Sequence, residues 1–277
     1  MTQPNVWRGR MLAATAAAAL LSVACGGDPA APADPLAGLE VSGDPSSPGG
    51  ATWTYRDVVG GVAYDLQGTL FKPPGIGPFP AIILSHGLDG GADDFQSLSE
   101  EMISWGLVAI ATNYTHSGGG VPSGSPGTSA MADWGASQAN VLRAAKCREI
   151  LASLGYVDRS RVAAHGHSMG AFVTAALVGT YPNDFIVASH TAGGVGVPYS
   201  TTEAQARGIR APYQMHHGDR DTTVPLTADQ RLDSILSASS VLRELVVYPG
   251  AGHGLVPQFA TVLGRIRSWY TTHGLLQ

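Results

Sequence analysis

The chain has 277 residues, of which 44% are hydrophobic and 13% are charged, and its formal net charge is −5 at pH 7. A charged share about half of the usual ~25% indicates a chain that folds around a large core, which excludes disorder for most of its length. With Lys72 and Lys146 as its only lysines and with two cysteines, the chain offers neither a basic surface for nucleic acid nor a disulfide framework.

The first 24 residues have the pattern of an export signal. Arg8 and Arg10 precede an apolar stretch over residues 11–24, and the segment contains no acidic residue, as in the charged and hydrophobic regions of a signal peptide. Small residues lead into Cys25, and this pattern resembles the site at which bacterial lipoproteins are cut and acylated. We expect residues 1–24 to be removed, Cys25 to carry a lipid, and the protein to be a lipoprotein of the cell envelope. Secretion without a lipid, with Cys25 as a free thiol, is the alternative.

Residues 25–50 are rich in Gly, Pro, Ala, Ser and Asp, a composition that predicts a flexible tether. Removal of the first 24 residues leaves 277 − 24 = 253 residues, and we expect one large α/β domain over residues 51–277. No later apolar run reaches the ~18 residues of a membrane span. We therefore expect the protein to contact a membrane only through the N-terminal lipid.

Strand-like and helix-like segments alternate in the rest of the chain. Residues 52–58 and 61–72 predict two antiparallel strands, because aromatic and β-branched residues lie between Gly and Pro breakers. Residues 131–154 have apolar residues at spacings of three and four, which predicts an amphipathic helix with Cys147 on its buried face. Residues 116–130, rich in Gly, Ser and Pro, predict a loop that borders a ligand crevice or is simply solvated. Continuous apolar runs predict strands buried on both faces of a parallel sheet at residues 81–85, 107–112, 162–164, 185–188 and 245–248.

This alternation predicts a mostly parallel central sheet with helices on both faces.

Residues 166–170 read Gly-His-Ser-Met-Gly, a G-x-S-x-G pentapeptide that places Ser168 at its centre. A strand-like run over residues 161–164 precedes it and helix-compatible residues 171–180 follow, which is the strand–turn–helix setting that such a serine nucleophile requires. A hydroxyl is a poor nucleophile near pH 7, so Ser168 needs a base and a site that stabilises an oxyanion.

Two loops that follow predicted strands supply the partners. His253 lies in a glycine-rich loop after residues 245–248 and is the expected general base and acid. Asp221 follows the segment 213–217 and is expected to orient His253, with Asp219 as an alternative that otherwise stabilises a turn. The order of serine, aspartate and histidine is the one found in α/β-hydrolases, and it differs from the orders of chymotrypsin-like and subtilisin-like proteases.

The expected oxyanion hole consists of the backbone N–H groups of Met169 and Leu88. Met169 directly follows the nucleophile, and Leu88 lies in the loop after strand 81–85. We expect His86 to support this loop by hydrogen bonding. The remaining paired histidines lie beside the catalytic turns without acidic or cysteine partners at a useful spacing, so we expect no metal and no cofactor; they are His165, His167, His216 and His217.

These motifs resemble the α/β-hydrolase superfamily, and within it dienelactone-hydrolase-type esterases, cutinase-like polyester hydrolases and platelet-activating-factor acetylhydrolases. The resemblance implies an α/β-hydrolase fold and a serine esterase activity, although true dienelactone hydrolases use cysteine where this chain has Ser168. Only 221 − 168 = 53 residues separate Ser168 from Asp221, so we expect no sizeable lid domain and an open site. The matching segments follow the family order and are residues 84–88, 157–162, 166–170, 221–225 and 252–253.

The sequence therefore predicts a serine-dependent carboxylic ester hydrolase that acts through an acyl-enzyme on small or polymeric esters. Few ionisable groups other than Arg220 accompany the motifs, which favours neutral esters. Two alternatives remain open. One is a serine peptidase or thioesterase of the same superfamily, and the other is a catalytically silent binding protein held by a lipid.

Overall fold

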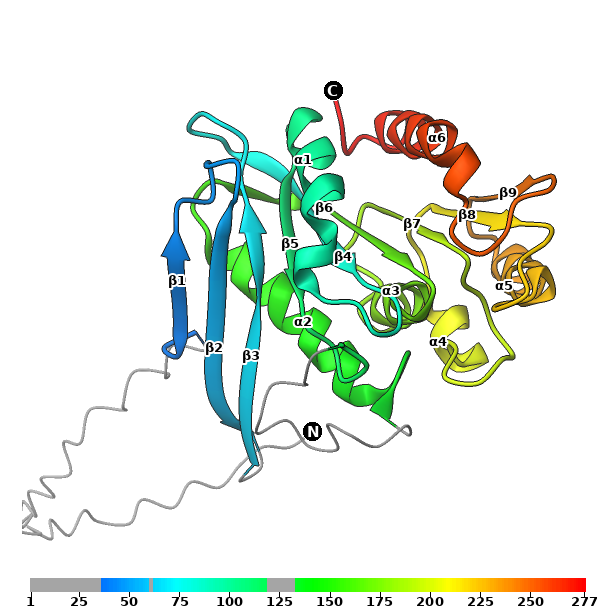
Figure 1. Cartoon of the computed structure of the whole chain (residues 1–277), viewed down its shortest axis with the longest axis horizontal. Helices are drawn as coiled ribbons and strands as arrows, with labels where there is room; N and C mark the ends of the chain where they lie inside the picture. Colours follow the sequence, from blue (N-terminus) through cyan, green and yellow to red (C-terminus); the bar gives the residue numbers. More distant parts are fainter. Residues whose placement is uncertain (1–35, 60–61, 119–132) are drawn as a thin grey trace, which may run out of the picture. The chain divides into compact units, whose positions relative to one another are not determined.

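The computed structural model describes residues 36–59, 62–118 and 133–277 (Figure 1). The expected signal peptide, Cys25 and most of the expected loop at residues 116–130 lie outside these ranges. Within the described ranges, no helix is both long enough and apolar enough to cross a membrane.

The described strands form a nine-stranded sheet in the order β1-β2-β3-β5-β4-β6-β7-β8-β9. The first three strands are antiparallel, and β3 also pairs antiparallel with β5. The strands from β5 across to β9 are parallel to one another, which confirms the predicted mostly parallel sheet. The strands are β1 (Leu39–Gly43), β2 (Ala51–Val59), β3 (Val62–Phe71), β4 (Phe79–Ser85), β5 (Val108–Thr112), β6 (Val157–His167), β7 (Val187–Thr191), β8 (Tyr213–Gly218) and β9 (Arg243–Tyr248).

Strand β1 corrects the predicted boundary between tether and domain. It lies within residues 25–50, and it pairs with β2 from Leu39 opposite Tyr55 to Gly43 opposite Ala51. The Gly, Pro and Ser residues that follow it form a turn, in which the Asp44 carboxylate accepts the N–H of Ser46 at 2.8 Å. A composition typical of linkers is also typical of turns. The folded domain therefore includes β1 and does not begin at residue 51.

Helices cover both faces of the sheet. One face packs against α2 (Gln138–Ser153), α3 (Met169–Thr180), α4 (Glu203–Gly208) and α5 (Leu226–Ala238). The other face packs against α1 (Gln96–Ser104) and α6 (Phe259–Thr272). Because both faces are covered, β4 and β5 are apolar along almost their whole length instead of alternating.

Cys147 of α2 is fully buried in the core between the sheet and the helices, as predicted from its place on an apolar helix face. Burial raises the pKa of its thiol well above the ordinary value, because the charged thiolate is disfavoured away from water. Cys147 is therefore a small core residue and not a reactive thiol.

The parallel strands end at a common edge of the sheet, and this edge positions the site. Strand β4 lies between β5 and β6. The chain runs from β4 to β5 through α1 and then back across to β6 through α2, on the opposite face of the sheet. Open α/β sheets bind ligands in the crevice at such a switch point, beyond the carboxyl ends of the strands. The loops that follow β4, β6, β8 and β9 all begin at this edge.

Trp53 of β2 links the antiparallel strands to the parallel strand β5. Its fully buried side chain crosses β3 at Gly68, where a Cβ atom would come within 2.8 Å of the indole. Its Nε1–H donates to the Ala111 carbonyl of β5 at 3.1 Å.

We expect Trp53→Ala to lower the free energy of unfolding by about 3–5 kcal/mol, measured by urea denaturation. Val41→Ala is the control, because Val41 lies opposite Trp53 but is 44% exposed, and an equal loss in the two variants would contradict this role.

Candidate active site

Ser168 lies on the tight turn between β6 and α3. Its φ is +56° and its ψ is −121°, a conformation that costs a residue with a side chain about 1–3 kcal/mol. The turn is held on both sides, because the Ser168 N–H donates to the Thr191 carbonyl at 3.0 Å and the Ser168 carbonyl accepts the N–H of Ala171 at 2.9 Å. This turn conformation places the Ser168 hydroxyl at the edge of the sheet.

The two glycines of the pentapeptide are required by close backbone contacts. A Cβ atom on Gly170 would lie 1.8 Å from the carbonyl oxygen of Ser85, at the end of β4. A Cβ atom on Gly166 would lie 2.2 Å from the carbonyl oxygen of Gly170. The start of α3 therefore packs against β4 more closely than any side chain allows.

The structure brings together the three residues that sequence reasoning selected. His253 Nε2 lies 2.8 Å from Ser168 Oγ, and His253 Nδ1 lies 2.7 Å from Asp221 Oδ2. The serine is buried, with 8% of its surface exposed, whereas the His253 side chain is 24% exposed and reaches solvent. Asp219, the alternative orienting residue, instead accepts the N–H of Gly250 at 2.6 Å and so joins the loops after β8 and β9.

Asp221 is held by its own turn. Its Oδ1 accepts the N–H groups of Thr223 at 2.8 Å and Val224 at 2.9 Å, and its side chain is fully buried. Burial would raise the pKa of this carboxyl, but the hydrogen bonds from His253, Val224 and Thr223 outweigh burial and lower the pKa below its usual value. Asp221 is therefore a fixed carboxylate that accepts the Nδ1–H of His253.

The expected oxyanion-hole residues, Met169 and Leu88, belong to two segments that lie next to Ser168. Met169 is the first residue of α3, so its N–H belongs to the helix N-terminus, which carries partial positive charge. Gly87, just before Leu88, approaches the serine so closely that a Cβ atom on it would lie 3.4 Å from Ser168 Cβ. In the same loop, the N–H of Asp89 donates to the His116 carbonyl at 3.0 Å.

Two buried histidines hold this loop. His86 Nε2 accepts the N–H of Tyr114 at 3.1 Å, so its Nδ1–H donates to the Gly87 carbonyl at 2.8 Å. His116 Nδ1 accepts from the Asn140 amide at 3.2 Å, so its Nε2–H donates to the His86 carbonyl at 3.2 Å. Burial lowers the pKa of His86 to about 4 and that of His116 to about 3, so both rings are neutral, as these bonds require. His86 supports the loop as predicted, whereas sequence reasoning missed His116 and Asn140.

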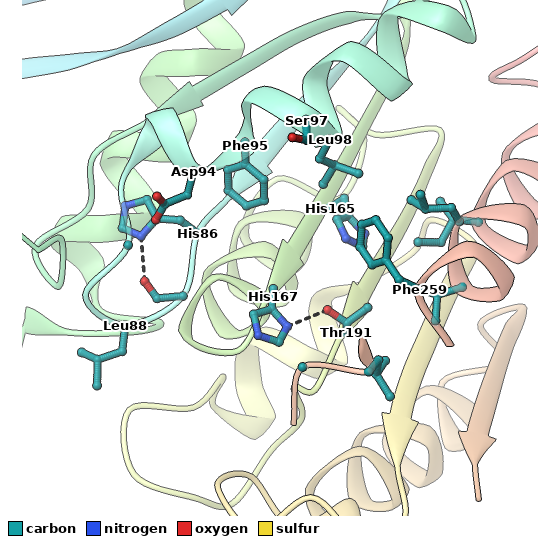
Figure 2. A pocket seen from close by; sticks show the side chains of 17 residues that line it. His86, Leu88, Asp94, Phe95, Ser97, Leu98, His165, His167, Thr191 and Phe259 are labelled. Atoms are coloured by element: carbon teal, nitrogen blue, oxygen red, sulfur yellow. Dashed lines mark hydrogen bonds between the residues drawn. The ribbon is translucent and has the colours of Figure 1, made fainter. Parts of the chain in front are cut away.

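A cavity of about 380 Å³ opens next to this loop, between α1 and α6 (Figure 2). Among the described residues that line it, Asp94 is the one carboxylate, and none is Lys or Arg. Leu88 is 45% exposed and Phe259 is 52% exposed, so apolar surface extends out of the cavity. Its apolar lining consists of Leu88, Phe95, Leu98, Leu255, Phe259, Val262, Leu263 and Ile266.

His165 and His167 of β6 also line the cavity (Figure 2). Their Nδ1 atoms bond to hydroxyls of β7, at 2.8 Å from Ser189 Oγ and 2.8 Å from Thr191 Oγ1. Burial lowers the pKa of His165 to about 3 and that of His167 to about 4. Both imidazoles are therefore neutral, and the described residues contain no cluster of three or more His, Cys, Asp or Glu that could hold a metal ion.

Comparisons with known proteins find a matching family profile and a similar esterase. The profile described as the Dienelactone hydrolase family matches residues 66–261. Esterase FrsA of Enterobacter sp. (strain 638) is 30% identical over 112 residues, which are 40% of this chain and 25% of that protein. The chain thus spans about a quarter of the length of this relative.

Two solved structures share the fold. Thermogutta terrifontis esterase 2 phosphorylated by paraoxon has a TM-score of 0.63 and 21% identity, over 87% of this chain and 96% of the other. An S-formylglutathione hydrolase from Agrobacterium tumefaciens has a TM-score of 0.63 and 15% identity, over 84% and 99%. At these identities the likeness concerns the fold, which is the α/β-hydrolase fold.

The packing of α3 on β4 predicts opposite effects for two glycine-to-alanine changes. We expect Gly170→Ala to lower the free energy of unfolding by more than about 2 kcal/mol, because its methyl group would overlap the Ser85 carbonyl. Gly264→Ala is the matched control in α6, where a Cβ atom meets nothing within 4 Å, and it should stabilise by about 0.5–1 kcal/mol. Urea denaturation measures both, and a neutral Gly170→Ala variant would contradict the close contact.

Proposed function

The chain belongs to the dienelactone hydrolase family, and we propose that it is a serine-dependent carboxylic ester hydrolase that acts through an acyl-enzyme. The observation that carries this proposal is the hydrogen-bonded series of Ser168, His253 and Asp221, with distances of 2.8 and 2.7 Å. A base in contact with the hydroxyl and a carboxylate behind the base are the two conditions for activating a serine.

The reaction begins when His253 Nε2 takes the proton of Ser168 as Oγ attacks the ester carbonyl. The carbonyl oxygen becomes an oxyanion, which the N–H groups of Leu88 and Met169 stabilise. Asp221 stabilises the imidazolium of His253, which then donates its proton to the departing alcohol. A water molecule, deprotonated by His253, attacks the acyl-enzyme and releases the acid, and the proton returns to Ser168.

The cavity beside the nucleophile supports neutral esters as substrates. Its lining is apolar apart from the neutral rings of His86, His165 and His167, the hydroxyls of Ser97 and Thr191, and the Asp94 carboxylate. An anionic group bound there would find no cation among the described lining residues, and it would lie near Asp94. An apolar substituent would gain about 0.8 kcal/mol for each buried methylene group.

The central test compares the wild type with Ser168→Ala on p-nitrophenyl acetate, a thioester and a peptide anilide. We expect ester hydrolysis to fall by at least about 10⁴-fold in Ser168→Ala, because the nucleophile is lost. Paraoxon, which phosphorylates the structural neighbour, should add one diethyl phosphate to Ser168, detected by mass spectrometry. Ser234→Ala, which changes an exposed serine of α5, should leave both results unchanged.

Three outcomes would count against an oxygen-ester hydrolase. Faster turnover of the anilide would favour the peptidase, and faster turnover of the thioester would favour the thioesterase. A correctly folded wild type that releases no burst of p-nitrophenol would favour the binding protein.

The cavity predicts a chain-length preference that one substitution should remove. We expect kcat/KM for p-nitrophenyl esters to rise from acetate to hexanoate, or to rise similarly along a series of alkyl acetates if the cavity binds the alcohol. Leu263→Trp should narrow the cavity and lower kcat/KM for the longest ester by about 10-fold, with little change for the shortest. Leu242→Trp, at a leucine that is 58% exposed and outside the cavity lining, is the matched control. An unchanged preference in Leu263→Trp would contradict this role of the cavity.

A further inference from the structure

A fully buried carboxylate that the reaction does not use lies behind Asp221. Asp229 of α5 bonds to two histidines of neighbouring strands, and none of the three side chains is exposed to solvent. Its Oδ2 lies 2.7 Å from His217 Nδ1, and its Oδ1 lies 2.7 Å from His190 Nε2. A buried charge is costly unless it is paired, so this arrangement needs a reason.

The contacts of His217 determine its protonation. Its Nε2 lies 2.9 Å from the Val224 carbonyl, which can only accept, so Nε2 carries a proton. Asp229 is ionised, because the charges and hydrogen bonds of His190 and His217 outweigh burial and hold its pKa well below the usual value. An ionised carboxylate also only accepts, so Nδ1 carries a second proton. His217 is therefore an imidazolium.

Burial by itself would lower the pKa of His217, but the hydrogen bond and charge of Asp229 outweigh burial and raise it above 6.5. The titratable groups that face His217 are Asp221 on the loop after β8 and Asp229 on α5, with His190 of β7 beyond Asp229. Tyr213 of β8 completes the group, since its hydroxyl lies 3.0 Å from His190 Nδ1. Burial raises the pKa of Tyr213, so its hydroxyl stays neutral.

The charge of His217 acts on the proposed catalytic residues through Asp221. His217 Nε2 lies 3.3 Å from Asp221 Oδ2, the same oxygen that lies 2.7 Å from His253 Nδ1. That oxygen thus has an imidazolium on one side and the proposed base on the other. A positive charge there offsets part of the negative charge of Asp221, so Asp221 attracts the His253 imidazolium less strongly than an unpaired carboxylate would.

We propose that His217 and Asp229 are positioning residues, a buried ion pair that holds Asp221 against His253 and offsets part of the carboxylate charge that His253 meets. The proposal rests on the hydrolase function proposed above. Asp229 supplies the counter-charge that keeps His217 protonated in the core, and His190 occupies the second carboxylate oxygen and so fixes its orientation. The pair acts on the reaction only through Asp221 and does not touch the substrate.

The decisive variant is Asp229→Asn, which keeps the shape of the side chain and removes its charge. His217 should then be neutral at pH 7, and the loss of the nearer positive charge should raise the pH of the acid limb of kcat/KM by about 0.5–1 unit. We expect kcat to fall by about 10-fold with little change in KM, since the substrate site is untouched. His217→Gln, which retains an N–H for the Val224 carbonyl, should shift the acid limb in the same direction and guards against a folding defect in Asp229→Asn.

Tyr213→Phe is the matched control for a merely structural role. It removes a hydroxyl at the far end of the same buried group, next to His190, and leaves Asp229 and His217 paired. We expect a lower melting temperature and an unmoved acid limb. An equal shift of the acid limb in Tyr213→Phe, or none in Asp229→Asn and His217→Gln, would overturn the positioning role.

A second measurement is independent of activity. Long-range ¹H–¹⁵N spectra of histidine-labelled wild type should show both ring nitrogens of His217 protonated at pH 6, and Asp229→Asn should show one. A neutral His217 ring in an enzyme that hydrolyses esters would overturn this inference and leave the proposed function intact. A wild type with no esterase activity would overturn the proposed function, whatever the charge of His217.

Discussion

The bond between Ser168 Oγ and His253 Nε2 joins side chains 85 positions apart in the sequence at a distance of 2.8 Å, and the rest of the site is arranged around it. Strands β6 to β9 lie side by side in parallel register, so the sheet sets the separation between the turn that carries the serine and the loop that carries the histidine. The close contact between Gly170 and the end of β4 then holds the serine in its strained conformation. The strain is localised at one residue, and the sheet and α3 support it on both sides.

The buried histidines near this edge of the sheet differ in charge. His86, His116, His165 and His167 are neutral, because desolvation dominates and no carboxylate bonds to their rings. His86 and His116 hold the loop before Leu88 by hydrogen bonds, and His165 and His167 line the cavity as neutral rings. His217 is charged, because Asp229 lies 2.7 Å from it. The same side chain thus serves as a neutral support on one side of the nucleophile and as part of an ion pair on the other.

The fold and the candidate site were predictable to different degrees. The central strands were recognisable as continuous apolar runs, since both faces of the sheet are covered. Strand β1 was missed, because five residues among glycines and prolines carry too little periodicity to distinguish a short edge strand from a tether. The choice between Asp219 and Asp221 rested on a two-residue difference in spacing, and the turn at Thr223 and Val224 is what directs Asp221 toward His253.

The sequence by itself determined the strand–turn–helix around Ser168, the alternation of strands and helices, and the order of the serine, aspartate and histidine. These features depend on local periodicity and on the conformational freedom of glycine, which are properties of neighbouring residues. Only the tertiary structure decided that Asn140 orients His116, that α1 and α6 enclose a cavity, and that Asp229 lies against His217 and His190. Each of these contacts joins elements far apart in the chain, and the charge of a buried histidine depends on which groups the fold places around it.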